Sequence, residues 1–245
     1  MFSAMLLALV PFVGAKTLSV DFSEYNSSMT VSEFLSAKGF MINTYDVDGG
    51  DPYNRTYEAD NVGIADGYLT LKVTGGTKPG SNVPSACIQT IDSNIVSGTF
   101  KTTAIASDVE GVCHGFFTFE SNSQESDIEI LTSFLYSGND AVNGGLQLTN
   151  QANNGNSSQN TRKAVPYPAD PTAGQHEYTL EWSSGSSKFF FDGSEVATIN
   201  ENVPTAPSAF LVNAWSGGNP NFTAGPPTED AILRVSKIEY VYETL

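Results

Sequence analysis

The chain has 245 residues, of which 11 are basic and 27 acidic, and its formal net charge at pH 7 is −16. Such a negative field repels nucleic acids and anionic lipid surfaces, so neither is expected as a partner. The 22 glycines and 12 prolines leave little room for long helices.

The first 15 residues hold an apolar run, residues 4–10, before Val13, Gly14 and Ala15. Such a run is too short to span a bilayer and, followed by small residues, is typical of a cleaved secretory signal. We therefore expect a signal peptide over residues 1–15 and a single domain over residues 16–245. No apolar tail follows Leu245, so we expect no membrane anchor, and a monomer that is released outside the cell or held by the cell wall.

Most of the chain shows the patterns of short β-strands. Apolar and polar residues alternate over residues 68–73, 178–182 and 233–241, and Asp-Gly and Ser-Gly turn signals separate such segments. Residues 31–35 are the one short helical turn that we expect. The pattern predicts an all-β fold, a sandwich or jelly roll of two packed antiparallel sheets.

Residues 46–51 contain three aspartates and two glycines, which are candidate calcium ligands and turn residues. The spacing misses the EF-hand pattern, so a solvated turn is the favoured interpretation. The chain has two histidines, no His-Glu-x-x-His run and no cysteine–histidine cluster with zinc spacing. We predict no metal and no cofactor, with a structural calcium left open.

In a secreted protein, asparagines can be glycosylated and cysteines can form disulfides. Asn-x-Ser/Thr sequons are predicted glycosylation sites at Asn26, Asn54, Asn156 and Asn221. Cys87 and Cys113 are the only cysteines, and in an oxidising compartment they most simply form a disulfide with each other. Two free buried thiols are the alternative.

The most informative stretch is residues 125–129, in which Glu125, Asp127 and Glu129 alternate with Ser126 and Ile128. In a β-strand these three acids share one face. A solvated sheet face is the simplest interpretation of such a charge cluster. The apolar and aromatic neighbours instead place the strand in the body of the fold, which favours acid/base chemistry.

Glycoside hydrolysis uses such acids. One carboxylate attacks the anomeric carbon or activates water, and a second, protonated one assists the leaving oxygen. A third negative group helps to keep one of them protonated. The Cα atoms of residues i and i+4 on a strand are about 13 Å apart, so the two Glu side chains would have to lean together. Spacing alone therefore permits a catalytic pair without proving one.

The stretch resembles the E-x-D-x-E signature of glycoside hydrolase family 16, whose members act on β-glucans and related polysaccharides. Further similarity to that family's strands and groove lies, in collinear order, at residues 98–101, 115–119, 176–182, 189–193 and 213–218. The likeness is to fungal secreted members, and it implies a concanavalin-like β-sandwich with a concave substrate groove.

The resemblance implies Glu125 as nucleophile, Glu129 as general acid/base and Asp127 as the residue that orients and tunes them. The short E-x-D-x-E form is similar to lichenases and cell-wall transglycosylases, whereas laminarinase-like members carry a bulged form. Lichenases have a tryptophan two positions before the nucleophile, and this chain has Ser123 there.

A sugar groove needs aromatic faces for stacking and amides for hydroxyl groups. Trp215 is the first stacking candidate, with a core tryptophan as the alternative, and Phe222 is the second. By alternation Asn213 faces the same side as Trp215. The resemblance further implies as substrate-binding residues Phe117, Phe119 and Asn150.

We expect a secreted, retaining endo-β-glucanase that hydrolyses β-1,3/1,4-glucan-type polysaccharides. The same residues would serve a transglycosylase that passes the glycosyl group to another sugar chain. A lectin-like glucan binder without turnover is the third alternative. The sequence leaves the linkage, and endo against exo action, open.

Overall fold

The computed structural model describes residues 14–48 and 52–245. Most of the predicted signal peptide lies outside the described residues, as do residues 49–51 of the candidate calcium segment. No helix in the described part of the chain is long and apolar enough to span a membrane.

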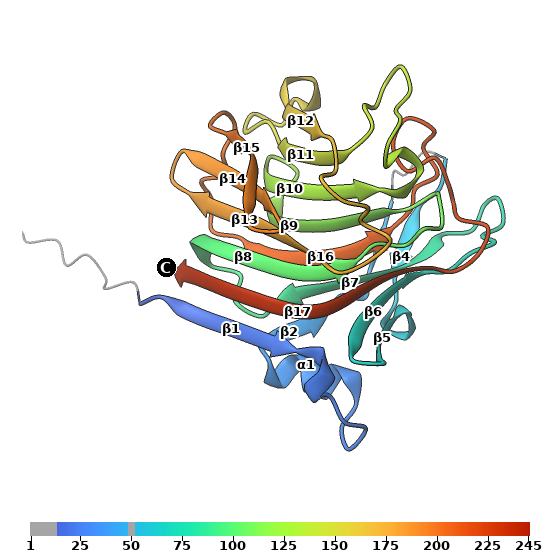
Figure 1. Ribbon diagram of the computed structural model, residues 1–245, viewed down its shortest axis with the longest axis horizontal. Helices are drawn as coiled ribbons and strands as arrows, with labels where there is room; N and C mark the ends of the chain where they lie inside the picture. Colours follow the sequence, from blue (N-terminus) through green and yellow to red (C-terminus); the bar gives the residue numbers. More distant parts are fainter. Residues whose placement is uncertain (1–13, 49–51) are drawn as a thin grey trace, which may run out of the picture.

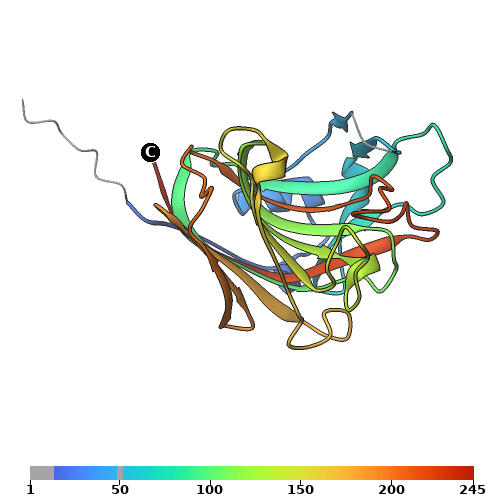
Figure 2. The same ribbon diagram turned by 90° about the horizontal axis from the view of Figure 1, so that it is seen from above.

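Two large sheets pack face to face, which confirms the predicted β-sandwich (Figure 1; Figure 2). The eight-stranded sheet has the order β15 (Ser194–Ile199), β14 (Ser186–Phe191), β13 (His176–Ser183), β8 (Ile95–Ile105), β17 (Ala231–Thr244), β6 (Tyr68–Val73) and β5 (Val62–Ala65), with β1 (Lys16–Asp21) paired to β17. The strands of this sheet pair antiparallel.

The nine-stranded sheet has the order β12 (Thr161–Val165), β11 (Leu146–Asn150), β10 (Gln124–Leu131), β9 (Cys113–Ser121), β16 (Ala209–Trp215), β7 (Val83–Thr90), β4 (Arg55–Tyr57) and β3 (Asp46–Val47), with β2 (Phe40–Ile42) paired to β7. Its pairs are antiparallel except β4 with β7, which is parallel. Short 3₁₀ helices η1–η4 lie at Phe22–Glu24, Ala59–Asn61, Thr132–Phe134 and Ser157–Gln159.

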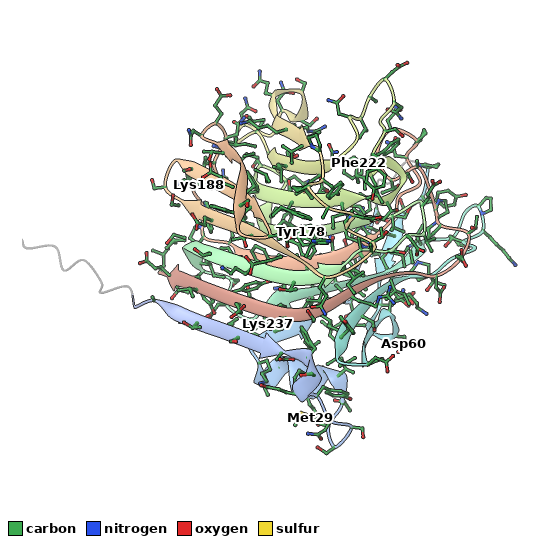
Figure 3. All side chains as sticks on the ribbon, viewed as in Figure 1. Met29, Asp60, Tyr178, Lys188, Phe222 and Lys237 are labelled. Atoms are coloured by element: carbon green, nitrogen blue, oxygen red, sulfur yellow. The ribbon has the colours of Figure 1, made fainter. Side chains whose placement is uncertain are left out.

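The main core fills the space between the two sheets and is rich in aromatic side chains. Phe100 of β8 stacks on Phe210 of β16, with ring centroids 4.3 Å apart, and Tyr240 of β17 packs edge-on against both. Tyr178 is fully buried, and Figure 3 shows it in the middle of the molecule. Alternate residues of each strand enter this core, so the remaining residues face outward. The outer face of the nine-stranded sheet carries the candidate site.

The expected helical turn is present as α1 (Val31–Ala37), which begins at a reciprocal cap. The Glu33 amide donates to the Thr30 hydroxyl at 3.2 Å, and the Thr30 amide donates to the Glu33 carboxylate at 2.7 Å. These bonds satisfy amide groups that the helix itself leaves unpaired.

Thr30→Ala should therefore lower the free energy of unfolding by about 1 kcal/mol. Urea unfolding followed by tryptophan fluorescence measures the change. Ser32→Ala, at an exposed position of the same helix, is the control and should change stability much less. Equal losses in the two variants would contradict the role of the cap.

The predicted disulfide between Cys87 and Cys113 is wrong, because both side chains are free and buried. Cys87 lies on β7 and Cys113 on β9, and β16 runs between these strands. Neighbouring strands are about 4.8 Å apart, so an intervening strand separates the two cysteines by more than the roughly 7 Å Cα distance that a disulfide tolerates. Proximity in sequence and the redox compartment could not reveal the intervening strand.

Candidate active site

The three acids lie on the outer face of the nine-stranded sheet, near the middle of β10. Their neighbours Ser126, Ile128 and Ile130 are buried on the opposite face, and this packing fixes which way the acids point. The β9–β10 register shifts between Gln124 and Glu125 and is then regular to Leu131. No bulge therefore interrupts the pairing of the three acids with β9, as the short motif predicts.

Two adjoining cavities form a groove over these acids, and Glu125, Glu129 and Trp215 line both. The first, of about 430 Å³, extends over β9, β16, β4 and β3 and is lined by aromatic side chains together with Arg55 and Asn213. The second, of about 350 Å³, extends over β11 and β12 and includes Gln151 and Arg162. The groove thus crosses the strands of the sheet, with the acids at the junction of its two arms.

Burial raises the pKa values of all three acids. Desolvation is the main cause, and repulsion from Asp127 adds to it for Glu129, whose pKa rises to about 8. The pKa of Asp127 lies well above its usual range because of desolvation and the charge of Glu125. The groove therefore keeps protons on part of the acid row in neutral solution.

Hydrogen bonds distinguish the two glutamates. Desolvation raises the pKa of Glu125, and a hydrogen bond from Asp127 favours its ionised form and opposes that rise. The Gln151 amide donates to Asp127 at 2.9 Å and so orients its carboxyl group. Because Asp127 supports the charge on Glu125, Glu125 is the acid suited to ionise and Glu129 the one suited to hold a proton.

Asn213 of β16 faces the first cavity, as the alternation predicts. Its amide group donates to the Tyr57 hydroxyl at 3.2 Å, while its buried carbonyl oxygen Oδ1 has no hydrogen-bond partner among residues 14–48 and 52–245. Gly115 of β9 lies in register between Asn213 and Glu129. A Cβ atom on Gly115 would stand 2.6 Å from that oxygen, so the glycine keeps open the space between the amide and the acid.

Trp215 lies in the groove but is not a free stacking platform. The Arg55 guanidinium lies 4.0 Å from the centroid of its ring, and Phe222 stacks on it with ring centroids 5.7 Å apart. Arg55 lines the first cavity and Phe222 the second. A pyranose ring can lie flat on Trp215 only if Arg55 or Phe222 moves aside.

Among the other predicted binding residues, Phe117 and Phe119 line the first cavity and Phe222 lines the second. Phe117 also packs edge-on against Phe119, so the rings serve both packing and the cavity wall.

The prediction for Asn150 as a substrate contact is wrong. This side chain is fully buried, accepts a hydrogen bond from Ser126 at 2.7 Å and donates to the Glu201 carbonyl. Because it pairs with Ser126, it shares that residue's core-facing side, while Thr149 pairs with Asp127 and lines the second cavity.

Four residues of the first cavity, Tyr45, Val47, Arg55 and Tyr57, come from the N-terminal quarter of the chain, where the sequence predicted no groove residue. Arg55 and Tyr57 alternate on β4, so one face was predictable, but its parallel pairing with β7 was not. On the other side Arg162 lies next to the acids and its charge lowers the pKa values of Asp127 and Glu129.

The sequons stay predictions. Asn26 and Asn156 are exposed and Asn54 is half-buried. Asn221 is exposed but lines the second cavity, so a glycan there would stand in the groove. Among residues 14–48 and 52–245 no group of three or more histidine, cysteine, aspartate or glutamate side chains is placed to hold a metal ion.

The family model "Glycosyl hydrolases family 16" matches residues 49–242, which is most of the chain and includes the three acids and most of the residues that line the groove. The chain belongs to glycosyl hydrolases family 16. The predicted membership of this family is thereby confirmed, and the protein is a glycoside hydrolase.

Relatives of this family 16 chain include both glucanases and fungal Crh-like proteins. A "Beta-glucanase" of Paenibacillus polymyxa is 27% identical over 174 residues, 69% of this chain and 67% of the relative. "Crh-like protein 2" of Botryotinia fuckeliana is 34% identical over 80 residues, 29% of this chain and 18% of the relative.

A solved structure supports the fold. The prokaryotic β-1,3-1,4-glucanase (lichenase) derived from a mouse hindgut metagenome superposes with a TM-score of 0.69 at 18% sequence identity, covering 94% of this chain and 99% of the other.

Proposed function

We propose that this family 16 protein is a secreted β-glucanase that cleaves β-1,3/1,4-glucan chains internally with retention of anomeric configuration. The observation that carries the proposal is the acid row at the junction of two cavities. An open groove with arms on both sides of the acids suits a polymer that continues past the cleaved bond in both directions. The similarity to bacterial β-glucanases supports the choice of polymer.

In the proposed mechanism the ionised Glu125 carboxylate attacks the anomeric carbon and forms a glycosyl-enzyme, while Glu129 transfers its proton to the departing glycosidic oxygen. Glu129 then takes a proton from water, which attacks the same carbon and releases the sugar from Glu125. Asp127 donates its hydrogen bond to Glu125 when Glu125 is ionised, and Gln151 holds Asp127 in place.

The space in front of Gly115 is the proposed position of the sugar nearest the acids. There the Asn213 carbonyl oxygen would accept a hydrogen bond from a sugar hydroxyl. This bond would satisfy a buried oxygen that has no partner in the described part of the chain.

Gly115→Ala should reduce kcat/KM on glucan about tenfold or more, since a single added carbon in a filled pocket has effects of this size. Initial rates on soluble mixed-linkage glucan measure the loss. Gly174→Ala is the matched control, because a Cβ there meets no atom within 4 Å. An unchanged rate in Gly115→Ala would refute the proposed position of the sugar in front of Gly115.

A transglycosylase is the second candidate, favoured by the similarity to a Crh-like protein. In that reaction a sugar hydroxyl, not water, attacks the glycosyl-enzyme. Product masses from the protein with mixed-linkage β-glucan, laminarin and xyloglucan, each with a fluorescent oligosaccharide acceptor, distinguish the two. Short unlabelled fragments support the hydrolase, and label in longer chains supports the transglycosylase. No product from any polymer, with Glu125→Gln as the blank, would refute both.

A further inference from the structure

Glu129 has an unusual hydrogen-bond partner. The Cys113 thiol donates to Glu129 Oε1 with a sulfur–oxygen distance of 3.6 Å. Asp127 is engaged with Glu125 and Gln151 instead. Within the described part of the chain no other side chain donates a hydrogen bond to Glu129, so the thiol alone fixes the direction of this carboxyl group.

The surroundings keep this thiol protonated. Cys113 is the first residue of β9, is fully buried and lies in register between Leu131 of β10 and Trp215 of β16. It belongs to a small apolar cluster that also contains Phe134 and Val142. Burial and the charge of Glu129 raise the pKa of the thiol well above its ordinary value, so it is available as an S–H donor throughout the neutral range.

We propose that Cys113 is a positioning residue for Glu129, which it holds in the groove by a hydrogen bond weak enough to leave the carboxyl group protonated. An S–H group is a weak donor. A hydroxyl group at the same place would donate more strongly and favour the ionised carboxylate, which would make Glu129 a poorer acid. The inference rests on the proposed role of Glu129 as general acid.

Other charges also act on Glu129, and they are the same in all the variants compared. The titratable and charged groups that share its two cavities come from β10, β4, β12 and the residue that precedes β3. They are Glu125, Asp127, Arg55, Tyr57, Arg162, Lys163 and Tyr45. The Lys163 amine donates to the Thr198 carbonyl and is therefore held by β15. A change confined to the donor atom at position 113 thus isolates the effect of the hydrogen bond.

The test is the titration of the Glu129 carboxyl group by ¹³C NMR, with its signal assigned by the loss of that signal in Glu129→Gln. In Cys113→Ser we expect the midpoint to fall by about half a pH unit or more, because an O–H donor replaces an S–H donor. In Cys113→Ala we expect it to stay or rise, because the donor is lost. Cys87→Ser, at the other buried thiol of the sheet, should leave it unchanged.

Kinetics provide the second readout. The alkaline limb of the kcat/KM profile, where the general acid loses its proton, should move to lower pH in Cys113→Ser by the same amount. In Cys113→Ala kcat should fall with little change in KM, since the acid is less well oriented while the sugar contacts remain.

A Glu129 midpoint that stays in place or rises in Cys113→Ser would overturn the proposal. If only Cys113→Ala folds, an unchanged kcat in that variant, or a midpoint that falls in it, would overturn the proposal. Because the titration needs no substrate, its outcome is separate from the proposed function. If the protein cleaves no glucan but its variants show the expected titration shifts, the proposed function is refuted. The effect of Cys113 on Glu129 is then still supported.

Discussion

In Glu125→Gln we expect kcat for β-glucan hydrolysis to fall about 10³-fold or more, while the variant still binds the polymer. The amide has nearly the shape of the carboxylate but cannot form a glycosyl ester. Rates on mixed-linkage glucan and retention on an insoluble glucan measure the two properties. The matched control is Glu120→Gln, an exposed glutamate on the neighbouring strand β9, which should keep the full rate.

Added azide gives the assignment a chemical signature. In Glu125→Ala the azide ion can enter the vacated space and attack the anomeric carbon directly, so an activated β-glycoside should give the α-glycosyl azide, with one inversion. A Glu125→Gln protein with an undiminished rate, or a β-azide from Glu125→Ala, would refute Glu125 as the nucleophile.

Glu129→Ala is expected to slow glucan hydrolysis by about 10²- to 10⁴-fold, because the departing sugar oxygen then leaves without a proton. Formation of the glycosyl-enzyme from a dinitrophenyl β-glucoside oligomer should be affected far less, since dinitrophenolate departs without protonation. Burst kinetics of dinitrophenolate release separate this first step from the second.

In the same variant azide should replace water on the glycosyl-enzyme and give the β-glycosyl azide, with net retention. Equal loss on the polymer and on the activated substrate would contradict the role of Glu129 as acid/base. Opposite azide configurations from the two alanine variants would therefore assign both glutamates independently of their position in the motif.

Alternation along single strands was the part of the fold and site that the sequence could predict. The rule that places Glu125, Asp127 and Glu129 on one face also places Asn213 with Trp215, and the structure has both arrangements. These predictions succeed because each concerns neighbours on one strand, where the backbone geometry alone determines the facing.

Relations between strands could not be predicted in this way. The expected disulfide failed because β16 lies between the strands of Cys87 and Cys113. Asn150 was displaced from the groove by one residue, since a shift of one position on a strand reverses the face. Arg55 lies in the groove because its strand β4 pairs in parallel with β7, and no local sequence pattern predicts that pairing.

The position of Arg55 also changes the expected role of Trp215. The sequence predicts an open ring for a sugar, but a guanidinium lies over that ring in the structure. The charge of Arg55 also lowers the pKa values of Glu125 and Glu129. The tryptophan thus holds a cation near the acids as well as forming the wall between the two cavities.

Locating the covalent intermediate tests double displacement through Glu125. Glu129→Gln incubated with the dinitrophenyl oligoglucoside should accumulate the glycosyl-enzyme, because the first step needs no acid and the second lacks its base. The mass of the intact protein should rise by that of one oligoglucosyl group, the substrate without its dinitrophenolate, and peptide mapping should place this group on Glu125. No adduct alongside dinitrophenolate release, or an adduct on any other residue, would contradict double displacement through Glu125.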